Sequence, residues 1–352
     1  MEIKGFDIGN LHLRKPVVQG GMGVGISLSG LSAAVAKEGG LGVISAAHPG
    51  YMEADFEENT AKANIRALKK HIAKAKADSE SGVIGVNIMC AMNGYEDYVR
   101  ASCEAGADII ISGAGLPAEL PKLVEGYDIK IAPIVSPPKA AKVLLKLWDK
   151  RYGKTADMVV IEGPKAGGHL GYSREEAVVL DKTGYDKEII EIKEIVEIYE
   201  KKYNKHIPIV FGGGVYSHED LCHYLELGLD GVQVASRFVA TRECDASDAF
   251  KEAYVHACKR DIGLVTSPVG MPGRAIRNAF IKDIEANRPK INKCYNCIKT
   301  CNPSDTPYCI SKALINSAKG DTDHGLVFCG AETYRINSVT DVKSVMKDLL
   351  EG

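Results

Sequence analysis

Eight short apolar runs, each followed by a segment with helical periodicity, restrict how this chain of 352 residues can fold. The runs are apolar along their whole length, as in parallel strands covered on both faces. Alternation with helices indicates a parallel sheet, and a count of eight favours a closed (β/α)8 TIM barrel over an open doubly wound sheet. We expect strands at Pro16–Gly20, Leu41–Ser45, Val83–Ile88, Asp108–Ser112, Lys130–Val135, Met158–Glu162, Ile207–Phe211 and Gly231–Ala235.

The connecting segments carry apolar residues at the spacing of one helix face. Lys139–Tyr152 and Lys187–Tyr203 both repeat them at i, i+3, i+4 and i+7. Ser217, followed by Asp220 three residues later, has the spacing of a capping box and predicts a helix start after the seventh strand. The barrel interpretation therefore has helices as well as strands in the right order.

Two stretches depart from this alternation. Pro164–Asp186 is rich in glycine and charge, and we expect a long, functional loop there because loops above about 12–15 residues are uncommon. From about Asp261 onward the pattern stops. We therefore predict a barrel over residues 1–260 and a C-terminal, cysteine-containing extension over 261–352 that packs on it.

Charge and hydropathy exclude several classes of protein. Lys and Arg number 44 against 46 Asp and Glu, and the lack of long basic runs argues against nucleic acid as a partner. No run of 18 apolar residues could cross a membrane, and the first residues lack a signal peptide's apolar core. We expect a cytoplasmic enzyme with a small-molecule substrate, reduced or metal-bound cysteines, and an oligomeric state left open, a homodimer being one option.

Glycine clusters follow four of the predicted strands, at the barrel end where active sites lie. Barrel enzymes often bind phosphate between the loops after strands seven and eight. Those loops are Gly212–Gly214 and Ala235–Arg237, in which glycine backbone and the Ser236 hydroxyl can donate to phosphate oxygens. A phosphorylated ligand or cofactor is favoured over a plain tight turn.

Two polar residues stand at predicted strand ends. His169 lies in a glycine-rich strand-end loop, and a side chain with a reference pKa of about 6.5 suits proton transfer near neutral pH. Asn87 ends the third strand, where an amide can hold the edge of a cofactor or cap a turn. We take His169 as the candidate catalytic residue.

Taken in order, the strand-end motifs resemble the nitronate monooxygenase (2-nitropropane dioxygenase) family, which includes flavin-dependent enoyl-acyl-carrier-protein reductases. The similar segments span about residues 1–280 and comprise Pro16–Gly23, Ser112–Pro117, Ala166–Gly171, Gly212–Gly214 and Gln233–Phe238.

The resemblance implies an FMN-bound TIM barrel with His169 as the active-site histidine. Implied flavin contacts are Gly21, Met22, Gly23, Asn87, Gly167, Gly168, Gly213, Gly214, Gln233, Ala235 and Ser236. Lys165 is a further candidate, which could stabilise the reduced flavin or a substrate carboxylate, a solvated loop lysine being the alternative. Lys165 departs from the family, which often has Glu before Ala-Gly-Gly-His, and Ala235-Ser236 replaces the more usual Gly-Thr. The first departure leaves the substrate in doubt.

Three functions follow for the same pocket. The first is FMN-dependent oxidation of alkyl nitronates or nitroalkanes with O2, as in a nitronate monooxygenase. The second is NAD(P)H-dependent reduction of enoyl thioesters or quinones through the FMN. The third, from another class, is a non-flavin barrel that binds a sugar phosphate; it leaves the first glycine cluster and Asn87 unexplained.

Four cysteines within sixteen residues form a separate motif in the extension. Cys294, Cys297, Cys301 and Cys309 resemble the cluster motif of flavin-dependent dienoyl reductases, with a shorter last gap, and Cys329 is a spare candidate ligand. Four thiolates can hold structural zinc or a 4Fe-4S cluster, which the sequence does not separate from each other or from free thiols. An iron–sulfur cluster would favour the reductase.

Overall fold

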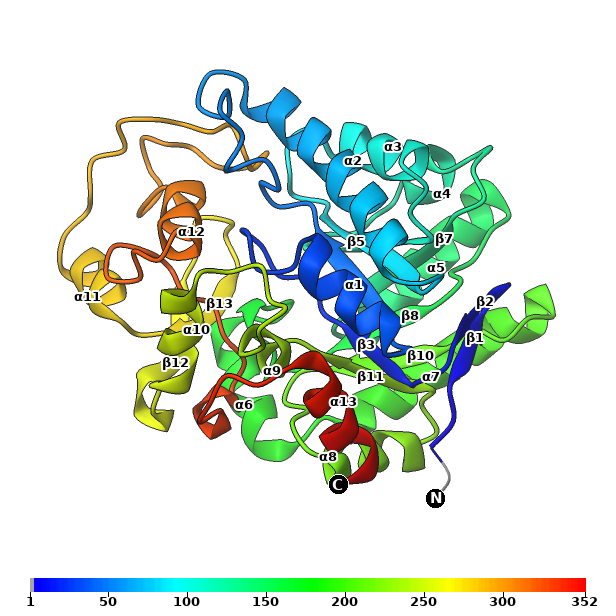
Figure 1. Ribbon diagram of the computed structural model, residues 1–352. Helices are drawn as coiled ribbons and strands as arrows, with labels where there is room; N and C mark the ends of the chain where they lie inside the picture. Colours follow the sequence, from blue (N-terminus) through cyan, green and yellow to red (C-terminus); the bar gives the residue numbers. More distant parts are fainter. Residues whose placement is uncertain (1–2) are drawn as a thin grey trace.

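A closed barrel of eight parallel strands forms the centre of the computed structural model, which describes residues 3–352 (Figure 1). This confirms the predicted (β/α)8 barrel, and no strand boundary differs from its prediction by more than two residues. The strands are β3 (Val17–Gln19), β4 (Leu41–Ser45), β5 (Val83–Met89), β6 (Ile109–Gly113), β7 (Lys130–Val135), β8 (Val159–Glu162), β10 (Ile209–Gly212) and β11 (Gly231–Val234), and β11 pairs with β3 to close the ring.

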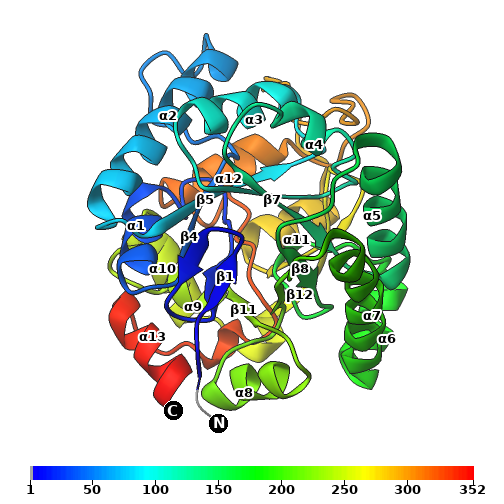
Figure 2. The ribbon, with the colours of Figure 1, turned by 90° about the vertical axis from the view of Figure 1, so that its right-hand side faces the viewer.

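The inside of the barrel is filled by β-branched and aliphatic side chains. Val18, Leu41, Val43 and Ile109 are almost fully buried there. A hairpin of β1 (Phe6–Ile8) and β2 (Leu11–Leu13), which the strand count did not include, adds apolar side chains to the same cluster. Figure 2 shows it in front of the ring of strands, so it closes the amino-terminal end of the barrel.

Helices surround the strands and bury their apolar faces against them. The predicted helices over 139–152 and 187–203 are confirmed, each starting one residue earlier, and both arms of the Ser217–Asp220 capping box are present. The helices are α1 (Ser29–Lys37), α2 (Thr60–Asp78), α3 (Tyr95–Glu104), α4 (Leu120–Leu123), α5 (Pro138–Tyr152), α7 (Asp186–Tyr203), α8 (His218–Glu226), α9 (Ser236–Val239) and α10 (Asp248–Val255).

The connection between β8 and β10 corrects one expectation. The segment 164–186 is not one long loop, because it contains β9 (Gly168–His169) and α6 (Arg174–Thr183). The Ser173 side chain accepts from the Glu176 amide, and the Glu176 carboxylate accepts from the Ser173 amide, so this helix begins with a capping box. That signal lies in the sequence, but the high charge of the segment obscured it.

Most of the extension lies over the carboxyl ends of the barrel strands, opposite the hairpin, whereas its last helix packs beside α1, α8 and α9 around the barrel (Figure 1). It contains η1 (Lys259–Asp261), β12 (Ile262–Thr266), β13 (Pro272–Ile276), α11 (Ala279–Ala286), α12 (Ile310–Ala318), η2 (Thr333–Arg335) and α13 (Val342–Glu351). Strands β12, β13 and β9 form an antiparallel sheet in which Gly273 pairs with His169. The extension is thereby joined to the barrel at the candidate catalytic residue.

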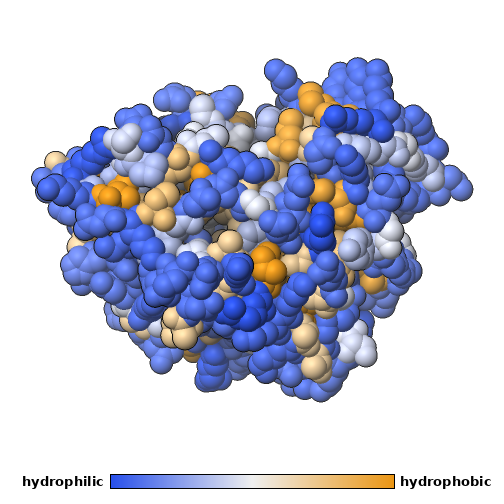
Figure 3. Space-filling view, turned by 90° about the horizontal axis from the view of Figure 1, so that it is seen from above, coloured by the Kyte–Doolittle hydropathy of each residue, from blue (hydrophilic) through white to orange (hydrophobic). Residues whose placement is uncertain are grey.

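The face shown in Figure 3 is mostly hydrophilic, with hydrophobic residues in small separate groups. Among residues 3–352, no helix combines the length and the apolar character needed to cross a bilayer.

Candidate active site

A cavity of about 510 Å³ lies at the carboxyl ends of the barrel strands. Its size is typical of a pocket for a small molecule or cofactor, which spans roughly 300–1,000 Å³. His169 and all twelve residues expected to contact a flavin lie on its wall: Gly21, Met22, Gly23, Asn87, Lys165, Gly167, Gly168, Gly213, Gly214, Gln233, Ala235 and Ser236. The structure thus brings the predicted site residues together, although their roles remain predictions.

The glycines after β3 leave no room for side chains. A Cβ atom on Gly21 would lie 2.3 Å from Cβ of Asn87, and one on Gly23 would lie 2.5 Å from Cβ of Ala47. The backbone of this loop therefore lies directly against the strand ends beside it. The loop therefore presents a backbone surface without side chains, against which a planar ring system fits.

At another part of the cavity the loops after β10 and β11 approach each other. Gly213 has a φ of +121°, and a Cβ there would lie 2.9 Å from the Gly163 carbonyl oxygen. The Gly330 amide donates to Ser236 Oγ at 3.0 Å, which leaves the Ser236 hydroxyl hydrogen for another acceptor. Glycine backbone and a hydroxyl are the groups that a phosphate monoester requires.

Lys165 supplies a cation on the same side. Its side chain passes over Gly214, where a Cβ would lie 2.9 Å from Lys165 Cδ. Its Nζ lies 3.7 Å from Oε1 of Glu332, and 42% of the side chain is exposed. The loose ion pair leaves the ammonium group able to interact with a phosphate as well.

His169 lies on the cavity wall between the barrel and the extension. Its Nε2 lies 2.7 Å from Oγ of Ser267, and the Phe328 ring meets it edge-on at 5.0 Å between centroids. Burial lowers the pKa of His169 to about 4, so the imidazole is neutral at physiological pH. A neutral ring has one donor and one acceptor nitrogen, and can therefore take a proton from a ligand.

Glu162 is a cavity residue that the sequence motifs did not single out. It ends β8, and its Oε2 accepts from the Gly171 amide at 3.2 Å and from Ser136 Oγ at 3.3 Å. Burial raises the pKa of this carboxyl to about 7, so it exchanges a proton near neutral pH. The strand-end position that drew attention to Asn87 would also have identified Glu162.

The extension adds further cavity residues, including Met271, Phe328 and Glu332. The guanidinium of Arg274 fixes this wall, because Nη1 donates to the carbonyl oxygens of Pro164 at 2.6 Å and Ala166 at 3.1 Å. No sequence signal could have placed these residues, since they reach the site through pairings across about a hundred residues.

The four predicted metal ligands, Cys294, Cys297, Cys301 and Cys309, line a second, small cavity of about 30 Å³. Burial raises the pKa of the Cys297 thiol to about 11, with smaller contributions from the nearby Cys309 and Cys301. Cys329 lies on the wall of the large cavity instead. Within residues 3–352, no group of three or more His, Cys, Asp or Glu is arranged to hold a metal ion, so the structure itself shows neither the zinc nor the iron–sulfur site expected from the motif.

Comparison with known proteins agrees with this geometry. A family model described as nitronate monooxygenase matches residues 6–352. A probable nitronate monooxygenase of Staphylococcus saprophyticus is 26% identical over 301 residues, covering 78% of each chain. A 5-hydroxy-7a-methyl-1-oxo-octahydro-1H-indene-4-carboxyl-CoA dehydrogenase of Mycobacterium tuberculosis is 25% identical over 278 residues, covering 78% of this chain and 67% of that one.

Two solved structures share the fold. FabK from Thermotoga maritima superposes with a TM-score of 0.72 at 23% identity, covering 96% of this chain and 91% of that one. A nitroalkane oxidase from Streptomyces ansochromogenes superposes with a TM-score of 0.68 at 20% identity, covering 95% of this chain and 94% of that one.

Proposed function

The chain belongs to the nitronate monooxygenase family and is an FMN-dependent oxidoreductase, and from this premise we propose that it oxidises alkyl nitronates or nitroalkanes with O2. The observation that carries the proposal is His169, a neutral imidazole on the wall of a cavity whose other walls fit a flavin. The proposal includes a small-molecule substrate, a cytoplasmic location and, as one option, a homodimer.

The residues of the large cavity fit FMN. The glycine loop after β3 and Asn87 would hold the ring system, while Gly213, Gly214 and Ser236 would hold the phosphate. When bound, FMN supplies a group that accepts electrons from substrate. The protein contributes binding, orientation and the protonation state of neighbouring groups.

His169 handles the proton in this proposal. With a nitroalkane, the neutral imidazole takes the proton from the carbon next to the nitro group. With a nitronate that proton is already gone, and the ring orients the substrate through a hydrogen bond. The contact with Ser267 and the edge of Phe328 hold the imidazole in one orientation for both tasks.

One observation favours a second candidate function, NAD(P)H-dependent reduction of enoyl thioesters or quinones. Met89, Met92, Met271, Leu314 and Phe328 give part of the cavity wall an apolar character that suits an acyl chain or a hydrophobic ring better than a small nitronate. The carboxyl-CoA dehydrogenase among the relatives is a protein named for a thioester substrate. Both functions use the same flavin position.

An anaerobic absorbance titration separates the two candidates. We expect purified protein to show a flavin spectrum that bleaches on addition of an alkyl nitronate and returns when O2 is admitted. Bleaching by NADH or NADPH, with recovery on adding an enoyl thioester or a quinone, would instead support the reductase. Protein that is colourless and takes up no added FMN would contradict both and leave the sugar-phosphate barrel.

A further inference from the structure

The segment that carries four cysteines, 294–309, surrounds a cavity that is separate from the active site. Cys294 is exposed, while Cys297, Cys301 and Cys309 are half-buried, and all four are free thiols. The volume of about 30 Å³ exceeds the roughly 10–15 Å³ that one water molecule needs. Four thiols therefore converge on a space that the surrounding side chains do not fill.

The backbone of this segment directs amide groups toward the sulfur atoms. Asn296 has a left-handed φ of 49°, and its amide donates to Sγ of Cys294 at 3.3 Å. Cys309 is the N-cap residue of α12, where the backbone amides of Ser311 and Lys312 lie near its thiol without forming a capping hydrogen bond. Amide donors at a helix N-terminus stabilise a negatively charged thiolate.

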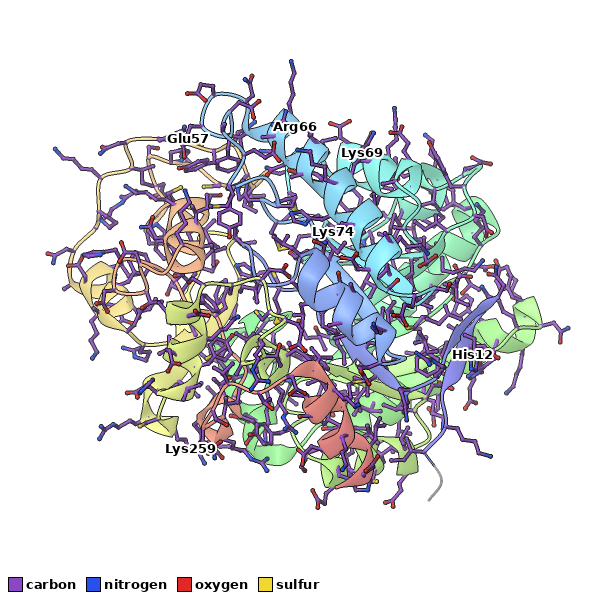
Figure 4. The ribbon with its side chains drawn as sticks, in the orientation of Figure 1. His12, Glu57, Arg66, Lys69, Lys74 and Lys259 are labelled. Carbon is purple, nitrogen blue, oxygen red and sulfur yellow. The ribbon has the colours of Figure 1, made fainter. Side chains whose placement is uncertain are left out.

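The segment is also fixed against the barrel. The Asn93 amide donates to the Cys297 carbonyl at 3.0 Å, and the Lys299 amide donates to the Ala91 carbonyl at 2.9 Å. Lys293 forms an ion pair with Glu57. Figure 4 shows Glu57 where the loop before α2 meets the extension. Few regular elements stabilise residues 287–309, so these contacts hold the thiols in place.

The cysteine segment packs against the wall of the large cavity proposed to hold the flavin. Cys297 and Cys301 pack in the same apolar cluster as Met89, Met271 and Phe328, and these three also line the large cavity. A redox centre at the thiols would therefore lie against the wall of the flavin site. A zinc ion has no redox chemistry to use there.

We propose that Cys294, Cys297, Cys301 and Cys309 ligate one 4Fe-4S cluster. Such a cluster needs four thiolates and holds them farther apart than a single ion does. Among residues 3–352 no group is arranged to hold a single metal ion, and the four cysteines instead line one common cavity. The proposal rests on the cysteines alone, and an occupied cluster would favour the reductase of the two candidate functions.

Elemental analysis of anaerobically purified protein tests the site. Protein treated with ferrous iron and sulfide is expected to hold about four iron atoms and four acid-labile sulfides per chain. The variants Cys297→Ser and Cys301→Ser are expected to lose most of both. Cys258→Ser changes an exposed cysteine outside the cluster and is expected to keep them.

Flavin content distinguishes loss of the cluster from loss of the fold. The Cys301→Ser protein is expected to retain FMN and an unfolding temperature close to that of the Cys258→Ser control. Absence of iron and sulfide from the treated wild-type protein would overturn the proposal. So would one zinc ion per chain that the Cys297→Ser and Cys301→Ser variants lose. Neither result depends on whether nitronates are the substrate.

Discussion

The barrel and the extension build opposite walls of one cavity by different means. The barrel approaches with backbone, through loops such as Gly20–Gly23 and Gly212–Gly214. The extension approaches with side chains, including Met271, Phe328 and Glu332. Backbone amides can hold a cofactor without depending on particular side chains. Bulky side chains shape the remaining space and can change with the substrate.

The two walls are fixed to each other where they meet. A Cβ on Gly167 would lie 2.5 Å from the backbone carbon of Cys329, so the barrel loop and the extension are in direct backbone contact there. Arg274 adds hydrogen bonds across the same junction. His169 lies at this junction, in a strand of the barrel loop that pairs with the extension. We therefore propose that the barrel holds most of the cofactor, that side chains of the extension shape the space for substrate, and that His169 between them handles the proton.

The largest expected effect on activity comes from a substitution at the junction between barrel and extension. His169→Ala should lower kcat by about 10²–10⁴-fold, the usual contribution of a general acid or base, while FMN stays bound. Because burial lowers the pKa of His169 to about 4, the wild-type ring is neutral above that pH. Activity on a nitroalkane should therefore fall only as the pH drops toward 4, and this acid limb should disappear in the variant.

Ser267→Ala is the matched control from the extension. It removes the partner of the imidazole but leaves the ring, so kcat should fall by less than in His169→Ala. The measurements are steady-state kinetics across pH and flavin content by absorbance. Loss of FMN from His169→Ala would show that this residue binds the cofactor. It would contradict the proposal that His169 handles the proton while the barrel loops bind FMN.

A smaller effect, on FMN affinity, is expected when a glycine of the barrel wall is substituted. In Gly21→Ala the new Cβ would lie 2.3 Å from Cβ of Asn87, so the loop must move. The backbone surface that contacts the flavin ring would move with it. We expect FMN affinity to fall about 100-fold, or about 2.8 kcal/mol at 1.4 kcal/mol per factor of ten. Fluorescence titration of flavin-free protein measures it.

Gly106→Ala controls for the glycine itself. Gly106 has a φ of +79°, a Cβ placed on it would have no neighbouring atom within 4 Å, and the residue does not line the cavity. This substitution should lower the unfolding temperature through backbone strain and leave FMN affinity unchanged. Equal FMN affinity in Gly21→Ala and Gly106→Ala would show that the barrel wall does not depend on its glycines.

The same contrast explains how much could be predicted from sequence. The barrel strands follow from local apolar runs, and residues at parallel strand ends must converge, which is why Asn87, His169 and Ser236 were found. The extension joins the site where Gly273 and Arg274 of β13 pair with His169 and Gly168 of β9, which are far away in the sequence. Periodicity carries no information about such pairings, so Ser267, Met271 and Phe328 were missed.

Glu162 was missed for a different reason. Its position as the last residue of the sixth predicted strand was visible in the sequence, but the environment that shifts its pKa was not. Burial of the carboxyl beside Ser136 and Gly171 raises its pKa, and only the folded chain brings those elements together.

The smallest expected effect concerns Lys165, which belongs to the barrel loop but pairs with Glu332 of the extension. The pair is loose and the side chain is 42% exposed, so its interactions are weakened by solvent. Exposed ion pairs contribute about 0–1 kcal/mol, and Lys165→Met should therefore weaken FMN binding by only about two- to fivefold. Raising the salt concentration should shrink this difference, and Glu332→Gln, which frees the ammonium group, should strengthen FMN binding slightly.

A loss above about thirtyfold in Lys165→Met would make this lysine the main phosphate ligand, because about 2 kcal/mol exceeds what such a pair supplies. Cofactor binding would then depend on a side chain as well as on the backbone wall.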